Sequence, residues 1–128
     1  HRLRSGRFRL IEGNDAFSNR IHVRDLARGL EAMCERGVVG STYLICDDQP
    51  TSMSEIAQYC RELLGDISYP VLSWEEARAA LKPSHIAMIE DSKRLRNTRM
   101  RRDLGVELEF PTYREGLRQV AELHGWLV

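Results

Sequence analysis

The sequence lacks an excess of charge of either sign, a long apolar run and a secretory signal. Lys and Arg number 19, as do Asp and Glu, so the overall charge gives no reason to expect binding to nucleic acid or an anionic membrane. No apolar run approaches the ~18 residues that a membrane span needs. The basic N-terminal residues contain no apolar h-region. We therefore expect a cytoplasmic protein with no nucleic-acid or membrane partner.

Cysteine is scarce, and no two cysteines form a CxxC pair. Cys34 and Cys60 fall on apolar helix faces and Cys46 in a β-prone run, where cysteine packs as a small apolar residue. A zinc site would need closer ligands with His partners, so we expect no metal. No Gly-x-Ser-x-Gly elbow surrounds any serine, which argues against Ser/His/Asp catalysis. An odd number of unpaired cysteines is typical of a reducing compartment.

With 128 residues, 42% of them apolar and 30% charged, the chain has the length and composition of one folded domain. It contains no internal repeat, low-complexity tract or linker. The apolar spacing predicts four or five helices and two or three short strands. We therefore expect an α/β protein that is mostly helical, with too little sheet for a complete doubly wound fold.

Residues 19–37, NRIHVRDLARGLEAMCERG, organise this pattern. A strand signal at residues 21–23 runs directly into a helix, where Asp25 in the first turn complements the helix dipole. Gly37 is expected to end this helix in a left-handed conformation. Apolar residues recur at the i, i+3, i+4, i+7 spacing of one buried helical face. They are Val23, Leu26, Ala27, Leu30, Met33 and Cys34.

Three other helix starts carry a capping box, in which Ser or Thr precedes Glu by three positions. The pairs are Ser52 with Glu55, Ser73 with Glu76, and Thr112 with Glu115. The first of these helices turns Ile56, Cys60 and Leu63 inward, and the last covers residues 113–124. Asn97 is expected to cap a further short helix.

The β-prone run at residues 41–46 suits a strand that is buried on both faces and lies beside the first two helices. Residues 84–91 fit either a short helix or a loop wall, and the pattern does not choose between them. These two segments complete the expected set of elements.

Three motifs in this order resemble the extended short-chain dehydrogenase/reductases, the NAD-dependent epimerase/dehydratase family. Residues 18–29 resemble its RxxIHVxDLAxG stretch, and TYLICDDQP with the capped helix behind it resembles its "vyNvgdd-p" pattern. The run SKRLRNTRMRRDLGVELEFPTYREGL resembles the end of the family's fold. The resemblance implies the C-terminal part of an NAD(P)-binding Rossmann-type fold.

In the intact protein this resemblance implies NAD or NADP and an epimerase, dehydratase or reductase reaction on a small polar substrate. Such chemistry needs a Gly-rich turn beside the pyrophosphate, and the family also uses a Tyr four residues before a Lys. The sequence has neither. We therefore expect residues 1–128 to be one substrate-side subdomain that lacks the Rossmann cofactor half, binds no cofactor alone and holds no catalytic residue.

The start of the chain also favours a fragment, since it has no initiating Met and begins with what we expect to be a helix end at residues 1–4. The alternative is a freestanding binding or interaction module that keeps this subdomain and is not catalytic. A fragment would leave strand edges at residues 21–23 and 41–46 without neighbours, so we expect self-association.

The resemblance places the substrate side at Ser18, Asn19, Arg20 and His22. Sugar-nucleotide members of the family carry an Arg, which pairs with the diphosphate, where this chain has Ser18. That departure argues against a nucleotide-sugar substrate. Two alternatives stay open, since Arg20 also fits a surface role and His22 also fits a packed, hydrogen-bonded one. The basic residues within 93–102 fit an ion-paired, solvated surface better than a nucleic-acid site, because no aromatic residue is interleaved with them.

Overall fold

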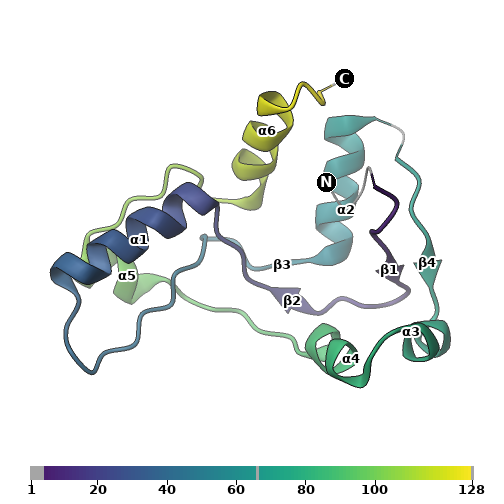
Figure 1. Ribbon diagram of the computed structural model, residues 1–128, viewed down its shortest axis with the longest axis horizontal. Coiled ribbons are helices and arrows are strands. Elements are labelled where there is room, and N and C mark those ends of the chain that lie inside the picture. The colour runs from purple at the N-terminus through teal and green to yellow at the C-terminus, as the bar shows by residue number, and fades with distance from the viewer. Residues whose placement is uncertain (1–4, 66, 128) are drawn as a thin grey trace.

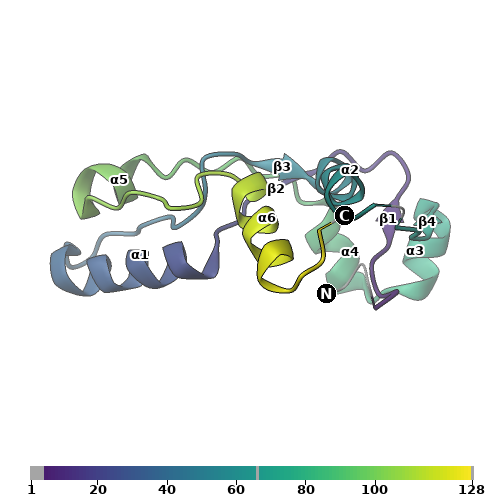
Figure 2. The ribbon, with the colours of Figure 1, turned by 90° about the horizontal axis from the view of Figure 1, so that it is seen from above.

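The computed structural model describes residues 5–65 and 67–127, so the helix end expected at residues 1–4 lies outside the described part. The helices are α1 (Val23–Arg36), α2 (Met53–Leu64), α3 (Trp74–Ala80), α4 (Pro83–Glu90), α5 (Thr98–Leu104) and α6 (Tyr113–Leu123). The chain forms an elongated body (Figures 1 and 2). Helices α1 and α5 form one end and α3 the other, and α2, α4 and α6 lie between them.

The described strands are two residues long and make two small ladders. Strand β1 (Leu10–Ile11) pairs in parallel with β4 (Val71–Leu72). Strand β2 (Phe17–Ser18) pairs antiparallel with β3 (Thr51–Ser52). The protein is therefore α/β and mostly helical, as expected, although its described residues form four very short strands where we expected two or three.

Two expected strands are wrong. Residues 21–23 hold no strand, because Val23 already begins α1. Residues 41–46 are neither helix nor strand, and within the described chain no backbone–backbone hydrogen bond reaches residues 42–46. A strand exists only through a neighbour that pairs with it, so the β-prone sequence of residues 41–46 remains without its ladder here.

The buried apolar residues of the described chain form three small, separate clusters and not one central core. Helices α2 and α6 enclose the first cluster, where Ile56, Cys60 and Leu63 are buried as predicted. The second joins α1 to α5 through Ala32, Met100 and the residues that follow α5. The third lies under α3 and α4. Each cluster is small, so the chain is held together by polar contacts between them as well as by burial.

All three expected capping boxes are present. At the start of α2, the amide of Ser52 donates to the Glu55 carboxylate across 2.8 Å, and the Glu55 amide donates back to the Ser52 hydroxyl across 3.2 Å. Residues 84–91, left open by the sequence, lie mostly in α4, which Pro83 begins. Proline suits a first helical position because its missing N–H has no helical partner there.

Asn97 precedes α5 as expected, but its side chain does not cap that helix. Its Nδ2 donates instead to the Cys46 carbonyl across 2.9 Å and to the Asp48 carboxylate across 2.7 Å. The side chain therefore connects α5 to the segment before β3, which a local helix signal does not predict.

Helix α1 has the predicted bounds but buries a different face. Its buried residues are Asp25, Gly29 and Ala32. The expected apolar face is largely solvent-exposed: Leu30 is 45% exposed, Met33 37% and Cys34 also lies at the surface. The prediction that these residues are buried is therefore wrong for this chain.

Gly29 within α1 and Gly37 just after it are both needed for close contact and not for a left-handed backbone. A Cβ on Gly29 would lie 2.9 Å from the Ile45 side chain, so glycine allows residues 41–46 to approach the helix. Gly37 has φ −65°, so the expected left-handed stop is wrong. A Cβ there would lie 2.3 Å from the Met33 carbonyl oxygen, which explains glycine at that position.

Candidate functional site

The four predicted substrate-side residues lie on one segment that runs from β2 to the start of α1 (Figure 1). Pairing of β2 with β3 brings Ser18 opposite Thr51, so the segment lies beside the loop that enters α2. The hydroxyl of Ser18 is oriented towards the Thr51 carbonyl across 3.4 Å. Ser18, Asn19 and Arg20 therefore lie beside residues 46–53, the segment that leads into α2.

Asn19 connects this segment to the chain after α4. Its Nδ2 donates to the Lys93 carbonyl across 3.0 Å, and its Oδ1 accepts from the Leu95 amide across 2.8 Å. Both polar atoms of the side chain are thereby used within the protein. This arrangement explains Asn19 as a positioning residue for residues 93–95.

Arg20 is the cationic group of the segment, and burial lowers its pKa in spite of nearby carboxylates. Its Nη1 donates to the carbonyls of Thr51 and Ser18 across 3.2 and 3.4 Å, and its Nη2 lies 3.9 Å from the Met53 sulfur. No described carboxylate forms an ion pair with it. A half-buried guanidinium that contacts only neutral groups can still bind an anion.

Asp47 is the second ionisable group at this point. Its amide donates to the Arg20 carbonyl across 2.6 Å, and its side chain is buried, with 3% of the residue exposed. Burial raises the pKa of its carboxyl to about 6, although an accepted bond from the Gln49 amide and the charge of Arg20 act in the opposite direction. An acid with this pKa can hold or release a proton near neutral pH.

His22 is packed rather than exposed. Its Nδ1 accepts from the Arg24 amide across 3.3 Å, so a neutral ring carries its hydrogen on Nε2, which lies 3.2 Å from the Gln119 side-chain oxygen. The ring also lies against Phe110, with centroids 3.9 Å apart. His22 thus links the start of α1 to α6, which fits the packed alternative that the sequence left open.

A cleft of about 420 Å³ lies on the α6 side of this histidine. Phe110 and Gln119, which both contact the His22 ring, belong to its wall, with Tyr59, Arg114 and Glu115. The Arg114 guanidinium stacks 4.5 Å from the Tyr59 ring centre. The wall therefore combines aromatic faces with charges of both signs, which suits a polar organic ligand.

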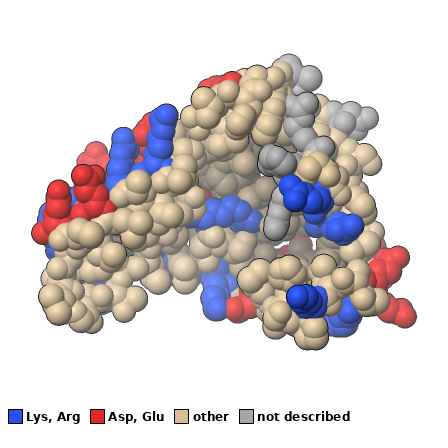
Figure 3. All heavy atoms as spheres, in the orientation of Figure 1, with Lys and Arg blue, Asp and Glu red and all other residues tan. Residues whose placement is uncertain are grey.

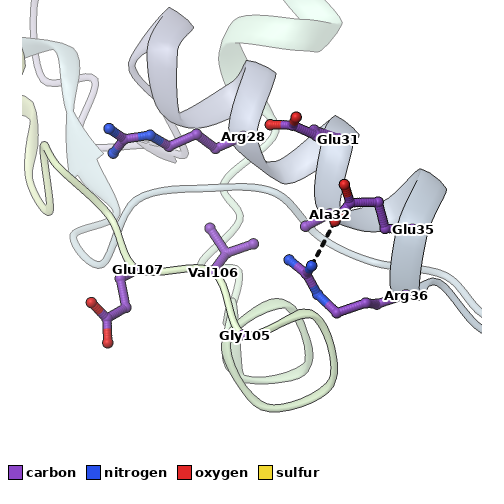
Figure 4. A pocket seen from close by; sticks show the side chains of 8 residues that line it. All are labelled: Arg28, Glu31, Ala32, Glu35, Arg36, Gly105, Val106 and Glu107. Atoms are coloured by element: carbon purple, nitrogen blue, oxygen red, sulfur yellow. Dashed lines mark hydrogen bonds and ion pairs between the residues drawn. The ribbon is translucent and has the colours of Figure 1, made fainter.

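A second, smaller hollow of about 210 Å³ lies between α1 and residues 105–107 (Figure 4). Arg36 closes one side, since its Nε donates to the Leu104 carbonyl across 2.9 Å and its Nη1 pairs with Glu35 across 2.7 Å. Both arginines that line the hollow already pair with carboxylates, Arg28 with Asp25 and Glu109, and Arg36 with Glu35. We therefore centre the candidate site on Arg20 and Asp47 and not on this hollow.

Sequence reasoning missed Asp47 as a site residue, because we used residues 47–50 only as the end of the TYLICDDQP motif. The available signal was a carboxylate immediately after a buried β-prone run, where functional groups often collect. The described residues contain no group of three or more His, Cys, Asp or Glu side chains arranged to hold a metal. They also contain no helix that combines the length and apolar character required to cross a membrane.

No family model and no curated protein matches the chain. Among solved structures it is similar to a conserved protein of unknown function from Silicibacter pomeroyi, with 33% identity and a TM-score of 0.79. That match covers 91% of this chain and 42% of the other. A second similar structure is RMD from Pseudomonas aeruginosa in complex with NADPH, with 16% identity and a TM-score of 0.61.

The RMD match covers 94% of this chain and 37% of RMD. The chain therefore spans less than half the length of either structure. At this identity the second match is evidence of fold alone. The chain has the fold of one part of a protein that was solved with NADPH bound.

Proposed function

We propose that this chain is the C-terminal, substrate-side portion of an NAD(P)-dependent epimerase/dehydratase- or reductase-like protein. The observation that carries this proposal is the match of 94% of the chain to only 37% of an NADPH complex. The family motifs in the sequence support the same assignment. The reaction belongs to the whole protein, and this portion contributes to the substrate side of the cleft.

We expect the cofactor to be bound by a part of the protein other than these 128 residues. A dinucleotide needs a Gly-rich turn whose backbone approaches the pyrophosphate at a helix N-terminus. The sequence has no such turn and no Tyr four residues before a Lys. NAD or NADP would therefore be held by the part of the protein that corresponds to the unmatched length of RMD.

The substrate side would use the segment from Ser18 to His22. Arg20 supplies a positive charge and Asp47 a buried acid whose pKa, at about 6, allows it to be neutral or charged. Ser18, an exposed residue at the end of β2, supplies a hydroxyl, whereas Asn19 and His22 hold this segment in place. These groups favour a small polar substrate with an anionic or strongly hydrogen-bonding part.

Calorimetry on two samples tests this assignment: the isolated 128-residue chain and the gene product at its native length, each titrated with NADPH and NADH. We expect micromolar binding of one of these by the native-length product and none by the isolated chain. Micromolar binding by the isolated chain, or none by either sample, would overturn the proposal. Arg20→Ala should leave dinucleotide affinity unchanged, as should the matched control Arg9→Ala at an exposed position.

The alternative function is a freestanding binding module. One observation favours it: every buried side-chain nitrogen and oxygen in the described residues has a hydrogen-bond partner, so the chain satisfies its own polar groups. The length of the native gene product distinguishes the two functions. A native product of about this length would be a freestanding module, which must stay folded and soluble by itself, whereas a much longer product would favour the proposed portion of a larger protein.

A further inference from the structure

Helix α6 carries all of its charged residues on one side. They are Arg114, Glu115, Arg118 and Glu122, and at about 100° per residue they fall within about 100° of one another around the helix axis. All four line the cleft of about 420 Å³ that lies beside His22. In Figure 3 charged side chains gather along the upper edge of α1, whereas the surface over α6 that faces the viewer is mostly uncharged. The charge of α6 is therefore concentrated at the cleft.

Two buried aromatic residues give the cleft a flat apolar part. Tyr59 and Phe110 both line it, with 6% and 7% of their surface exposed. The Arg114 guanidinium lies 4.5 Å from the Tyr59 ring centre, and the Tyr59 hydroxyl donates to the Arg114 carbonyl across 3.3 Å. A guanidinium is planar and stacks on aromatic rings. Because Arg114 is exposed, its outer face is available to a second flat group.

The charged groups of the cleft differ in how far the protein already uses them. The Glu115 carboxylate accepts from the Thr112 amide across 3.0 Å in the capping box of α6. By contrast, Arg118 and Glu122 form no ion pair or hydrogen bond with any residue that the structure describes. They lie one turn apart, which is about 6 Å along the helix axis. One cation and one carboxylate in the cleft are thus available to a ligand.

Gln119 adds a neutral donor to the same wall. Its side-chain oxygen lies 3.2 Å from Nε2 of His22, and its amide nitrogen makes no hydrogen bond within the described part of the chain. The cleft therefore offers donors from Arg114, Arg118 and Gln119 but only one uncommitted acceptor, Glu122. This excess of donors favours an anionic ligand.

The shape of these groups narrows the class of anion. A guanidinium binds a carboxylate through two parallel hydrogen bonds, so Arg118 suits a carboxylate. The outer face of Arg114 suits an aromatic ring. Glu122, one turn beyond Arg118, suits a hydroxyl or amine at the opposite end of that ring, because a carboxylate accepts hydrogen bonds only.

We propose that this cleft is a second ligand site, which binds a small aromatic carboxylate that carries a hydroxyl or amine opposite its carboxylate. Arg118 binds the carboxylate, Arg114 stacks on the ring and Glu122 accepts from the hydroxyl or amine. The site is separate from Arg20 and Asp47, neither of which lines the cleft. It goes beyond the proposed function and does not depend on it, since it uses only Phe110 and residues of α2 and α6.

Titration of the native-length gene product with 4-hydroxybenzoate tests this site, with the 128-residue chain titrated in parallel. We expect saturable binding in both samples, with a dissociation constant below about 1 mM by calorimetry. The His22 ring signals in nuclear magnetic resonance spectra should shift on binding, because Gln119 connects that ring to the cleft. This signature distinguishes the cleft from a site elsewhere on the protein.

Two further probes test the chemistry of the ligand. Cyclohexanecarboxylate keeps the charge without the flat ring, and 4-hydroxybenzamide keeps the ring without the charge. Each should bind about tenfold more weakly than 4-hydroxybenzoate, or weaker still. Equal binding of either probe would overturn the proposed ligand class.

Arg118→Gln should weaken the binding of 4-hydroxybenzoate by about tenfold or more. Arg9→Gln, at an exposed position that does not line the cleft, is the matched control and should leave it unchanged. Glu122→Ala should remove the advantage of 4-hydroxybenzoate over benzoate and leave benzoate binding as it was. Arg118 and Glu122 are exposed, so both variants should fold, as circular dichroism can verify.

Three outcomes would overturn the site itself. They are no binding at millimolar probe, binding that Arg118→Gln leaves unchanged, and binding by the isolated chain alone. In the last case the remainder of the protein would cover the cleft. These measurements involve no dinucleotide, so the loss of this site would leave the proposed function standing, and the absence of NADPH binding would leave this site standing.

Discussion

The carboxylate of Asp25 accepts a hydrogen bond from the backbone amide of Phe110 across 2.9 Å, and its other oxygen accepts one from the Glu109 amide at the same distance. Asp25 has no exposed surface. The sequence favoured it as a charge in the first turn of a helix, and it does lie there. Its larger role is to hold α1 against the segment that leads into α6.

Asp25→Ala should therefore destabilise the chain by about 2–4 kcal/mol, because two backbone N–H groups lose a charged acceptor in a buried position. Urea unfolding at neutral pH measures the change. Arg28→Ala is the control and should cost under about 1 kcal/mol, since Arg28 is half-exposed and reaches Asp25 only at 3.6 Å. Equal losses in the two variants would mean that Asp25 acts mainly through this ion pair.

Leu30→Ala should change the free energy of unfolding by less than about 0.5 kcal/mol in the isolated chain, because Leu30 is 45% exposed. Leu63→Ala, in the cluster between α2 and α6, should cost about 2–5 kcal/mol. Denaturant titration of both variants makes the comparison. A cost for Leu30→Ala that matches the cost for Leu63→Ala would show that the exposed apolar face of α1 is covered in solution.

Asp47 should make stability fall as the pH rises from about 4 to about 6. Its carboxyl has an ordinary pKa of 3.8 and a folded-state pKa of about 6, so the folded state favours the protonated form. The stability it contributes is complete below about pH 4 and is lost through pH 6. The difference corresponds to about 3 kcal/mol.

Asp47→Asn should remove that loss and leave the variant more stable than the parent chain at pH 7. Urea unfolding at pH 4, 5, 6 and 7 measures both proteins, and the exposed Asp15→Asn serves as the control. Parallel pH profiles for the parent and Asp47→Asn would contradict the assignment of this pKa to Asp47.

The isolated chain should self-associate through the exposed apolar residues of α1, among them Val23, Leu30 and Met33, and through the backbone of residues 43–45, which makes no backbone–backbone hydrogen bond within the described chain. Sedimentation velocity across a concentration series measures this, and Leu30→Asp should shift the chain towards monomer while Glu31→Ala does not. A parent chain that stays monomeric and folded at ~100 μM would contradict the prediction.

Local chemistry in the sequence was enough to predict where helices begin. Ser52, Ser73 and Thr112 each cap a helix with a Glu three residues later, and these bonds form within one turn of chain. The inward face of α2 also followed from spacing, because α6 lies against it in the same chain. The stretch from Ser18 to His22 stood out by its motif, and its role in substrate binding stays a prediction.

Tertiary structure decided the features that depend on a distant partner. The most apolar face of α1 is exposed because spacing identifies an apolar face but not whether the described chain supplies a surface to cover it. Residues 41–46 are β-prone yet unpaired, since a strand requires a second segment. Asp47 became a site residue only through burial beside Arg20, and burial arises from the packing of segments that are far apart in sequence.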